Sequence, residues 1–215
     1  MYYNVIVRRK ERKMTMDTTT KTQQAHMMKP NNNDIVSVLS TRNIMFAEAF
    51  TREYCLDIID LLKRVEEYDK LIGASKDELY IRITICSEGG SILALFALLE
   101  QIEHMKKIGY QVHTHSTFAA SCGFVLHCSG TYKTCSEFAS LLNHQGSSMA
   151  MGTIEEMKVS LEFSKSLEDK INNYLRANTE MSEDEILRPS RTYLDIWYGA
   201  EEPYQKGIVD KIIIL

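Results

Sequence analysis

The chain contains 215 residues, of which 44% are hydrophobic and 25% are charged. This length suits one well-buried domain and is short for two. The 25 basic and 29 acidic side chains are mixed along the sequence and give a formal net charge of −4, so we expect neither nucleic acid nor a membrane as a partner.

The first 33 residues differ in composition from the rest. They contain a basic cluster at Arg8–Lys13 and polar stretches at Thr18–Gln24 and Asn31–Asn33. We expect residues 1–33 to form a flexible segment and residues 34–215 to form a single domain. The basic cluster fits a solvated tail, with docking of a partner or targeting to an organelle as alternatives.

The sequence pattern in the first half of the domain predicts two strands, each followed by a helix. Asn43–Phe46 is expected to be a strand, and Thr51–Tyr68 an amphipathic helix. Leu79–Ile85 predicts a second strand, which ends at the motif Ser87-Glu88-Gly89-Gly90-Ser91. The apolar positions of the two helices are Leu56, Ile59, Leu62 and Val65, and then Ile92, Leu95, Leu99, Ile102 and Met105.

The second half repeats this order and then adds a long helix. We expect a strand at Gln111–Thr117, a helix at Cys122–Cys128, and strands around Tyr132–Cys135 and Ser140–Asn143. A capping-box pair, Thr153 with Glu156, marks the start of a helix over about residues 153–177. The apolar positions of this helix are Met157, Leu161, Leu167, Ile171 and Leu175.

The end of the chain predicts one short helix and a last strand. Ser182 and Glu185 form another capping-box pair, and their helix is expected to stop before Pro189. A turn at Gly207 leads into a strand that includes Ile213. The alternation of strands and helices predicts an α/β fold with a largely parallel sheet.

The five cysteines indicate a reducing compartment. They are odd in number and include no C-x-x-C pair, so we expect reduced, buried thiols at Cys55, Cys86, Cys122, Cys128 and Cys135. The sequence has neither an apolar run of the roughly 18 residues that a membrane span needs nor a signal peptide. We therefore expect a soluble protein in the cytoplasm, with an organellar matrix as the alternative.

Ser121 is a candidate nucleophile because it follows an apolar strand and opens a short apolar helix. A serine hydroxyl attacks a carbonyl at neutral pH only when a base takes its proton. His144 could supply that base and Asp195 could orient it, with Asp210 as an alternative third member. The histidine must be neutral to act as a base, so the activity should fall in acid.

A candidate oxyanion site lies at Gly89-Gly90, where a strand leads into a helix. Glycine allows the backbone to approach a substrate closely, and the N–H of Cys122 would be the second donor. A purely structural turn is the alternative. Ala119 replaces the first glycine of G-x-S-x-G, which argues against the nucleophile elbow of α/β hydrolases.

Taken together and in order, these motifs resemble the proteolytic subunit of Clp proteases. They are Ser87–Ser91 after one strand, Ala119–Gly123 after the next, His144-Gln145 after a short strand, and Asp195 upstream of the closing Gly207–Asp210. The resemblance covers the chain from about Asn43 to its C-terminus and implies the ClpP/crotonase fold, with repeated β-β-α units and a protruding handle helix.

The resemblance also implies the function. Ser121 would be the nucleophile, His144 the base and then the acid, and Asp195 the residue that stabilises the imidazolium, with Gly90 and Cys122 as oxyanion-hole donors. The protein would be a serine endopeptidase that degrades unfolded polypeptides inside stacked rings, expected to be heptameric. An AAA+ unfoldase would use ATP, and the protease itself would bind neither a cofactor nor a metal.

Several residues depart from the family pattern. Glu88 replaces a proline that is common in the glycine motif, Cys122 replaces a common methionine, and no proline follows His144-Gln145. The oxyanion donors are backbone groups, so none of these changes removes a catalytic group. The N-terminal segment, which contacts the ATPase in the family, fits the pattern poorly.

Three other functions stay open at this point. The first is a processing protease of the same fold that acts without an ATPase, as in the maturation of a viral scaffold. The second is a non-catalytic ring subunit, and the third an acyl-CoA enzyme of the crotonase type, whose chemistry needs no such triad. His113 and His115 share one face of a strand and suggest a metal site, but they lack a third ligand, so a structural or exposed role is favoured.

Overall fold

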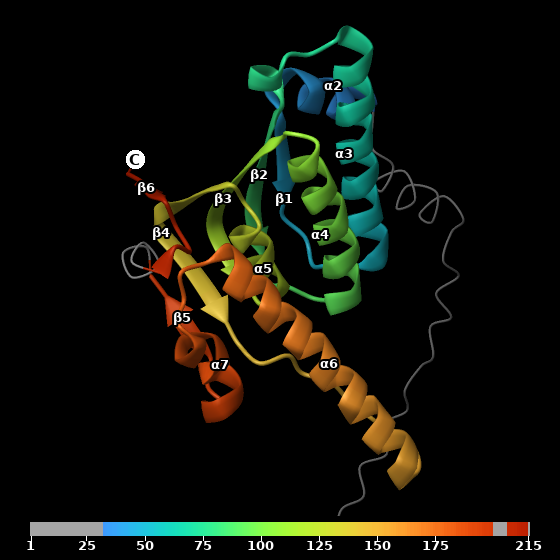
Figure 1. The fold of residues 1–215 in the computed structure, drawn as a ribbon, viewed down its shortest axis with the longest axis vertical. Coiled ribbons are helices and arrows are strands. Elements are labelled where there is room, and N and C mark those ends of the chain that lie inside the picture. The colour runs from blue at the N-terminus through green and yellow to red at the C-terminus, as the bar shows by residue number, and fades with distance from the viewer. Residues whose placement is uncertain (1–31, 200–205, 215) are drawn as a thin grey trace, which may run out of the picture.

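A computed structural model of the protein describes residues 32–199 and 206–214 (Figure 1). The helices are α2 (Asn32–Thr41), α3 (Arg52–Ile72), the 3-10 helix η1 (Lys76–Glu78), α4 (Ile92–Lys107), α5 (Cys122–Cys128), α6 (Ile154–Asn178) and α7 (Glu183–Thr192). The strands are β1 (Asn43–Phe46), β2 (Tyr80–Ser87), β3 (Gln111–Ala120), β4 (Tyr132–Asn143), β5 (Ile196–Tyr198) and β6 (Lys211–Ile213). The flexible segment expected at residues 1–33 lies outside the described residues, except that α2 begins at Asn32.

The strands form one mixed sheet in the order β1-β2-β3-β4-β5, and β6 pairs with the first part of β4. Every pairing is parallel except that of β4 with β5. The α/β fold expected from the sequence is confirmed. The two strands expected between Tyr132 and Asn143 are one long strand, whose pairing with β3 jumps from Cys135 to Ser140.

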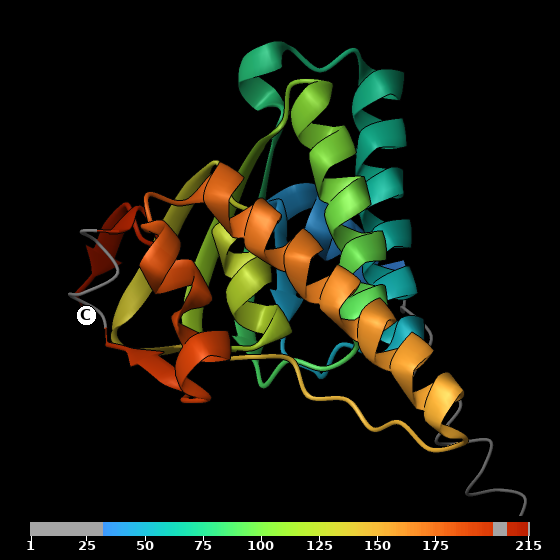
Figure 2. The same cartoon turned by 60° about the horizontal axis from the view of Figure 1, so that its bottom comes forward.

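One face of the sheet carries the core. Along β2 the side chains alternate, so that Ile81, Ile83 and Ile85 are fully buried beneath the helices while Arg82 and Cys86 are exposed. Helices α3, α4 and α5 lie over the buried face (Figure 2). Each fully buried isoleucine contributes about 1.5–3 kcal/mol relative to exposure.

This alternation corrects one expectation about the cysteines. Cys86 is exposed because it lies on the opposite face of β2 from the core isoleucines, whereas the other four thiols are buried. Burial raises the pKa of Cys55 and Cys135 to about 11 and that of Cys128 to about 12. These three thiols therefore stay protonated near neutral pH.

The buried stripe of α3 differs by one position from the sequence expectation. Leu56 is 50% exposed, while Cys55 takes its place facing the core beside Ile59, Leu62 and Val65. The positions i, i+4 and i+7 from Cys55 lie on one helical face, so the thiol and not the leucine continues the stripe.

Helix α7 continues through Pro189, which corrects the expected end of the helix before that residue. A proline lacks only its own N–H, so it removes one bond to the carbonyl of Glu185. The helix then ends one turn later at Tyr193, which adopts a left-handed conformation and donates its N–H to the Pro189 carbonyl. Neither α2 nor the antiparallel strand β5 is predicted by the sequence pattern.

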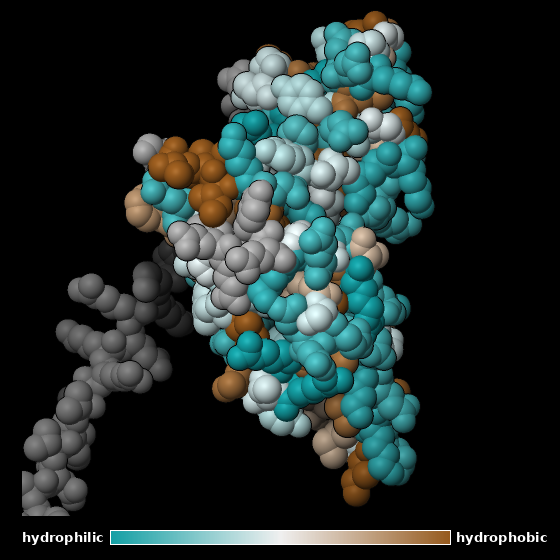
Figure 3. Space-filling model, turned by 60° about the vertical axis from the view of Figure 1, so that its left-hand side comes forward, coloured by the Kyte–Doolittle hydropathy of each residue, from teal (hydrophilic) through white to brown (hydrophobic). Residues whose placement is uncertain are grey.

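The long helix α6 projects away from the body of the protein (Figure 1), as the expected handle helix does. Its capping box is present, because the Thr153 hydroxyl accepts the N–H of Glu156 and the Glu156 carboxylate accepts the N–H of Thr153. The apolar side chains along α6 are buried near its C-terminal end and exposed near its N-terminal end. Leu167 and Leu175 pack at the base, while Leu161 and the free end are exposed, and brown apolar side chains gather at that end (Figure 3).

Candidate active site

Ser121 occupies a strained turn between β3 and α5. It combines φ 57° with ψ −119°, a conformation that a residue with a side chain adopts rarely and at a cost of about 1–3 kcal/mol. Its N–H donates to the Leu142 carbonyl of β4 at 3.0 Å. Such strain is typical of residues that a fold holds in place for chemistry, and here β4 does the holding.

The glycine motif after β2 is held by several hydrogen bonds. The Ser87 hydroxyl donates to the Glu48 carbonyl at 2.7 Å and accepts the Gly89 N–H at 3.2 Å. Phe50 donates its N–H to the Gly89 carbonyl and accepts the Ser91 N–H, each at 2.8 Å. Among the residues described here, the Gly90 N–H is thus the one N–H of Gly89–Ser91 that no protein group accepts.

Gly89 packs directly against the backbone around Ser121. It has φ 100°, and a Cβ added to it would lie 2.6 Å from the Ser121 Cβ, 2.8 Å from the Ala120 carbonyl oxygen and 3.1 Å from the Cys122 nitrogen. Only glycine permits this approach. The approach brings the turn that carries one predicted oxyanion donor, Gly90, against the backbone that carries the other, Cys122.

His144 and Asp195 meet because β5 pairs with the end of β4. Asn143 is registered opposite Ile196, so the residues that follow and precede them are neighbours. The His144 Nδ1 lies 3.6 Å from the Asp195 Oδ1, which is an ion-pair separation longer than a hydrogen bond. Asp195 is largely exposed at this edge of the sheet.

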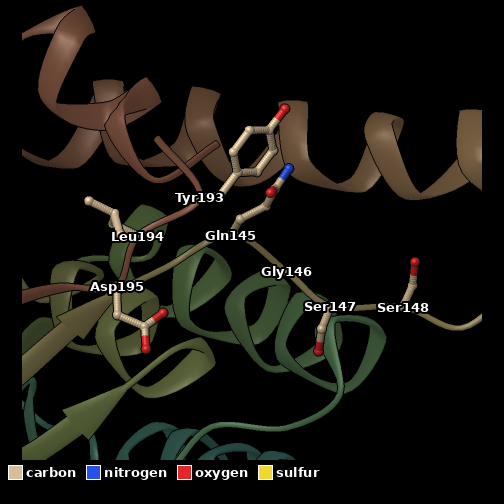
Figure 4. Close-up of a pocket in the computed structure, with 7 residues that line it drawn as sticks. All are labelled: Gln145, Gly146, Ser147, Ser148, Tyr193, Leu194 and Asp195. Carbon is tan, nitrogen blue, oxygen red and sulfur yellow. The ribbon is translucent and has the colours of Figure 1, made fainter. Parts of the chain in front are cut away.

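Ser121 and His144 line one groove with a volume of about 530 Å³, between the glycine motif and helices α6 and α7. No hydrogen bond joins their side chains in the described part of the chain. A second hollow of about 420 Å³ adjoins it, between Gln145–Ser148 and Tyr193–Asp195 (Figure 4). In that view Tyr193 and Gln145 lie beside each other near α6, and Asp195 points the other way, toward the strands.

Asp210, the alternative third member, is engaged elsewhere. Its carboxylate accepts the Lys133 N–H at 2.6 Å, and its own N–H donates to the Lys133 carbonyl at 2.7 Å. These bonds join the start of β6 to β4, which is a structural role. The geometry therefore places Asp195, and not Asp210, at His144.

The histidine pair of β3 makes ring and side-chain contacts. His113 lies between the rings of Tyr80 and Tyr132, with centroids 6.3 and 5.4 Å away. The His115 Nδ1 lies 2.9 Å from the Thr134 hydroxyl. Within residues 32–199 and 206–214, no three His, Cys, Asp or Glu side chains are grouped as metal ligands.

Cys122 lies next to Ser121 and could compete with it as a nucleophile. Burial raises the pKa of its thiol to about 11, so the reactive thiolate is scarce at neutral pH. The Cys122 Sγ instead donates to the Gly90 carbonyl at 3.2 Å. This bond links the two segments that carry the predicted oxyanion donors.

His127, near the end of α5, joins the helix to the C-terminal segment. Its Nε2 lies 2.9 Å from the Ile208 carbonyl, which can only accept, so Nε2 carries the proton and Nδ1 accepts from the Ser116 hydroxyl at 2.8 Å. The His127 side chain is fully buried. Burial lowers the pKa of His127 to about 3.

We expect this histidine to make the fold sensitive to acid. The unfolded chain binds the His127 proton near pH 6.5, whereas the folded chain binds it only near pH 3. The free energy of unfolding is therefore unaffected by this group above about pH 6.5. It falls by about 1.4 kcal/mol per pH unit as the pH drops from there toward 3. Urea unfolding at pH 7.5 and 5.5 should show a smaller difference for His127→Gln than for the parent protein. Equal differences would contradict this assignment.

One residue that shapes the site carried no recognisable signal in the sequence. Phe50 holds the glycine motif through two long-range backbone bonds, and none of its neighbours in the sequence suggests this role. Among the described residues, no helix combines the length and apolar character that would let it cross a bilayer.

Comparison with known proteins agrees with the fold and with the family resemblance. The family described as Clp protease matches residues 23–214. The ATP-dependent Clp protease proteolytic subunit of Cyanophora paradoxa is 29% identical over 185 residues, covering 85% of this chain and 89% of that protein. The ATP-dependent Clp protease proteolytic subunit 3 of Rhodococcus jostii (strain RHA1) is 30% identical over 146 residues, covering 66% of this chain and 70% of that protein. The chain therefore belongs to the Clp protease family of serine peptidases.

Proposed function

We propose that Ser121, His144 and Asp195 form the catalytic triad of a Clp-type endopeptidase. The observation that carries this proposal is the strained turn at Ser121, packed against Gly89 and sharing a groove with His144. His144 takes the hydroxyl proton as Ser121 attacks a peptide carbonyl, and then gives it to the leaving amine. Water, activated by His144, hydrolyses the acyl-enzyme in the second half of the reaction.

The negative charge that develops on the carbonyl oxygen would be stabilised by the N–H groups of Gly90 and Cys122. Donors that are fixed before the reaction lower the barrier because they need no reorganisation, and one such donor is worth about 3–4 kcal/mol. Asp195 stabilises the imidazolium of His144. The separation of 3.6 Å leaves a small movement before a hydrogen bond forms, and such bonds commonly tighten when substrate binds.

The protease would work as stacked rings fed by an ATP-driven unfoldase. Both relatives are named as subunits of ATP-dependent proteases, and the exposed apolar side chains of α6 suit contact with another subunit. Enclosure inside rings would restrict a broad active site to polypeptides that arrive unfolded. ATP would be used by the partner, and the heptameric ring and the cytoplasmic location are parts of the same proposal.

Mass measurement of the intact assembly, with and without a fluorophosphonate probe, tests this proposal. We expect a ring-sized complex that gains one probe adduct per subunit, located at Ser121 by peptide mapping. A monomer would contradict the ring. A ring that stays unlabelled would instead favour the non-catalytic subunit. Cleavage of folded or assembled proteins without an ATPase would favour the processing protease.

A further inference from the structure

Asn143 lies beside the proposed nucleophile on the neighbouring strand. It is the last residue of β4, and the preceding residue, Leu142, accepts the N–H of Ser121 at 3.0 Å. Only 7% of Asn143 is exposed, and it lines the same groove as Ser121 and His144. A polar side chain is therefore buried in the wall of the groove, next to the reacting centre.

The carboxamide of Asn143 has a donor without a partner. Its Nδ2 is buried and makes no hydrogen bond to any described residue. A buried polar group left unpaired costs about 1–3 kcal/mol, so a partner that reaches it gains that free energy. The lining of the groove also includes apolar side chains, among them Leu167 and Ile171 of α6 and Ile186 of α7.

We propose that Asn143 determines substrate specificity, by hydrogen bonding the side chain of the residue whose carbonyl Ser121 attacks. This inference rests on the proposed peptidase function and names its preferred substrate. The preferred side chain is uncharged, with an apolar stem and a terminal carboxamide, as in glutamine. The stem packs between α6 and α7, and the carboxamide pairs with that of Asn143.

The charges of the groove favour an uncharged side chain. Lys165 and Glu168 of α6 both line it, so neither sign of charge dominates. The Glu168 carboxylate already accepts from the Gln145 Nε2 at 3.3 Å. A carboxamide can both donate and accept, so it satisfies Asn143 whichever way that amide is turned. Methionine has nearly the same shape as glutamine but lacks these groups, which makes it the matched comparison.

The test compares two fluorogenic peptides that differ only in glutamine or methionine at the residue before the cleaved bond. We expect kcat/KM to favour glutamine by about tenfold in the parent protein, because the methionine peptide leaves Asn143 unpaired. In Asn143→Leu the preference should disappear or reverse. A methionine preference in the parent, or an unchanged ratio in Asn143→Leu, would overturn the proposal.

Gln101→Met provides a matched control. Gln101 lies on α4 and is the other described residue with a buried, unpartnered side-chain nitrogen, but it does not line the groove. Both substitutions remove an unpaired buried amide and should raise the melting temperature. Only Asn143→Leu should change the ratio between the two peptides, so a change in Gln101→Met as well would indicate a purely structural effect.

A binding measurement tests the specificity site at Asn143 independently of the proposed catalytic triad. Uncleaved peptides of both kinds are titrated into Ser121→Ala, with Asn143 intact or replaced by leucine. Tighter binding of the glutamine peptide that depends on Asn143 supports the specificity site even where no hydrolysis is found. Equal binding of both peptides by Ser121→Ala would overturn the specificity site and leave the proposed triad standing.

Discussion

Peptide hydrolysis by the Ser121→Ala variant should fall by at least about a thousandfold. The reason is that no acyl-enzyme can form, while the proposed oxyanion donors and the groove remain. The N–H of Ser121, and not its hydroxyl, donates to Leu142, so the alanine variant keeps this bond to β4. Turnover of a fluorogenic peptide, measured beside the mass of the assembly, checks this result.

Ser147→Ala is the matched control for this loss. Ser147 lines the same groove and is exposed, but it has no place in the proposed triad. Its removal should leave kcat within about twofold of the parent. If Ser121→Ala kept full activity, or if both variants lost it equally, the proposed mechanism would be wrong.

Replacing Gly89 with alanine should also strongly reduce activity, with at least about a hundredfold loss of kcat/KM. The new Cβ would lie 2.6 Å from the Ser121 Cβ and 2.8 Å from the Ala120 carbonyl oxygen, so the backbone at Ser121 must move. A displacement of even 1 Å at a reacting group costs roughly this factor. Peptide kinetics and the yield of fluorophosphonate adduct at Ser121 both measure it.

Gly73→Ala is the matched control, because it introduces backbone strain at a positive φ without the steric clash expected at Gly89. Gly73 ends α3 with φ 66°, and a Cβ there would meet nothing within 4 Å. Alanine at Gly73 should cost about 1–2 kcal/mol of stability and leave kcat unchanged. If Gly89→Ala behaved in the same way as Gly73→Ala, the close packing of Gly89 on Ser121 would have no catalytic importance.

The regular elements could be predicted because their signals are local. The strand Asn43–Phe46 and the helix Cys122–Cys128 have the bounds expected from the sequence, and the Thr153–Glu156 capping box marks the start of α6. Each depends on apolar periodicity or on a cap within a few residues. A pattern of that range is visible without knowledge of the fold.

Features that depend on distant partners could not be predicted. Strand β5 has three residues and exists because the end of β4 offers an open edge. Pro189 was expected to end α7, but the helix continues past it at the loss of one hydrogen bond. The exposure of Cys86 could not be predicted, because the buried face of β2 is determined only when the helices pack on it.

The candidate site shows the same division. The motifs around Ser121 and Gly90 were visible as strand-to-helix turns. The residues alone left Asp195 and Asp210 open, and only the family resemblance favoured Asp195. The physical basis of that choice is the antiparallel pairing of β5 with β4, which places Asp195 beside His144. The unpaired amide of Asn143 was also invisible, because a burial pattern does not reveal which hydrogen bonds are missing.

The position of β4 between β3 and β5 has a consequence for biosynthesis. Ser121 follows β3, His144 follows β4 and Asp195 precedes β5, so the proposed triad is complete only when three neighbouring strands are in register. Asp195 is also the last of the three to leave the ribosome, behind the whole of α6 and α7. A nascent chain with an exposed Ser121 would therefore be inactive, and proteolysis would begin only after synthesis has passed β5.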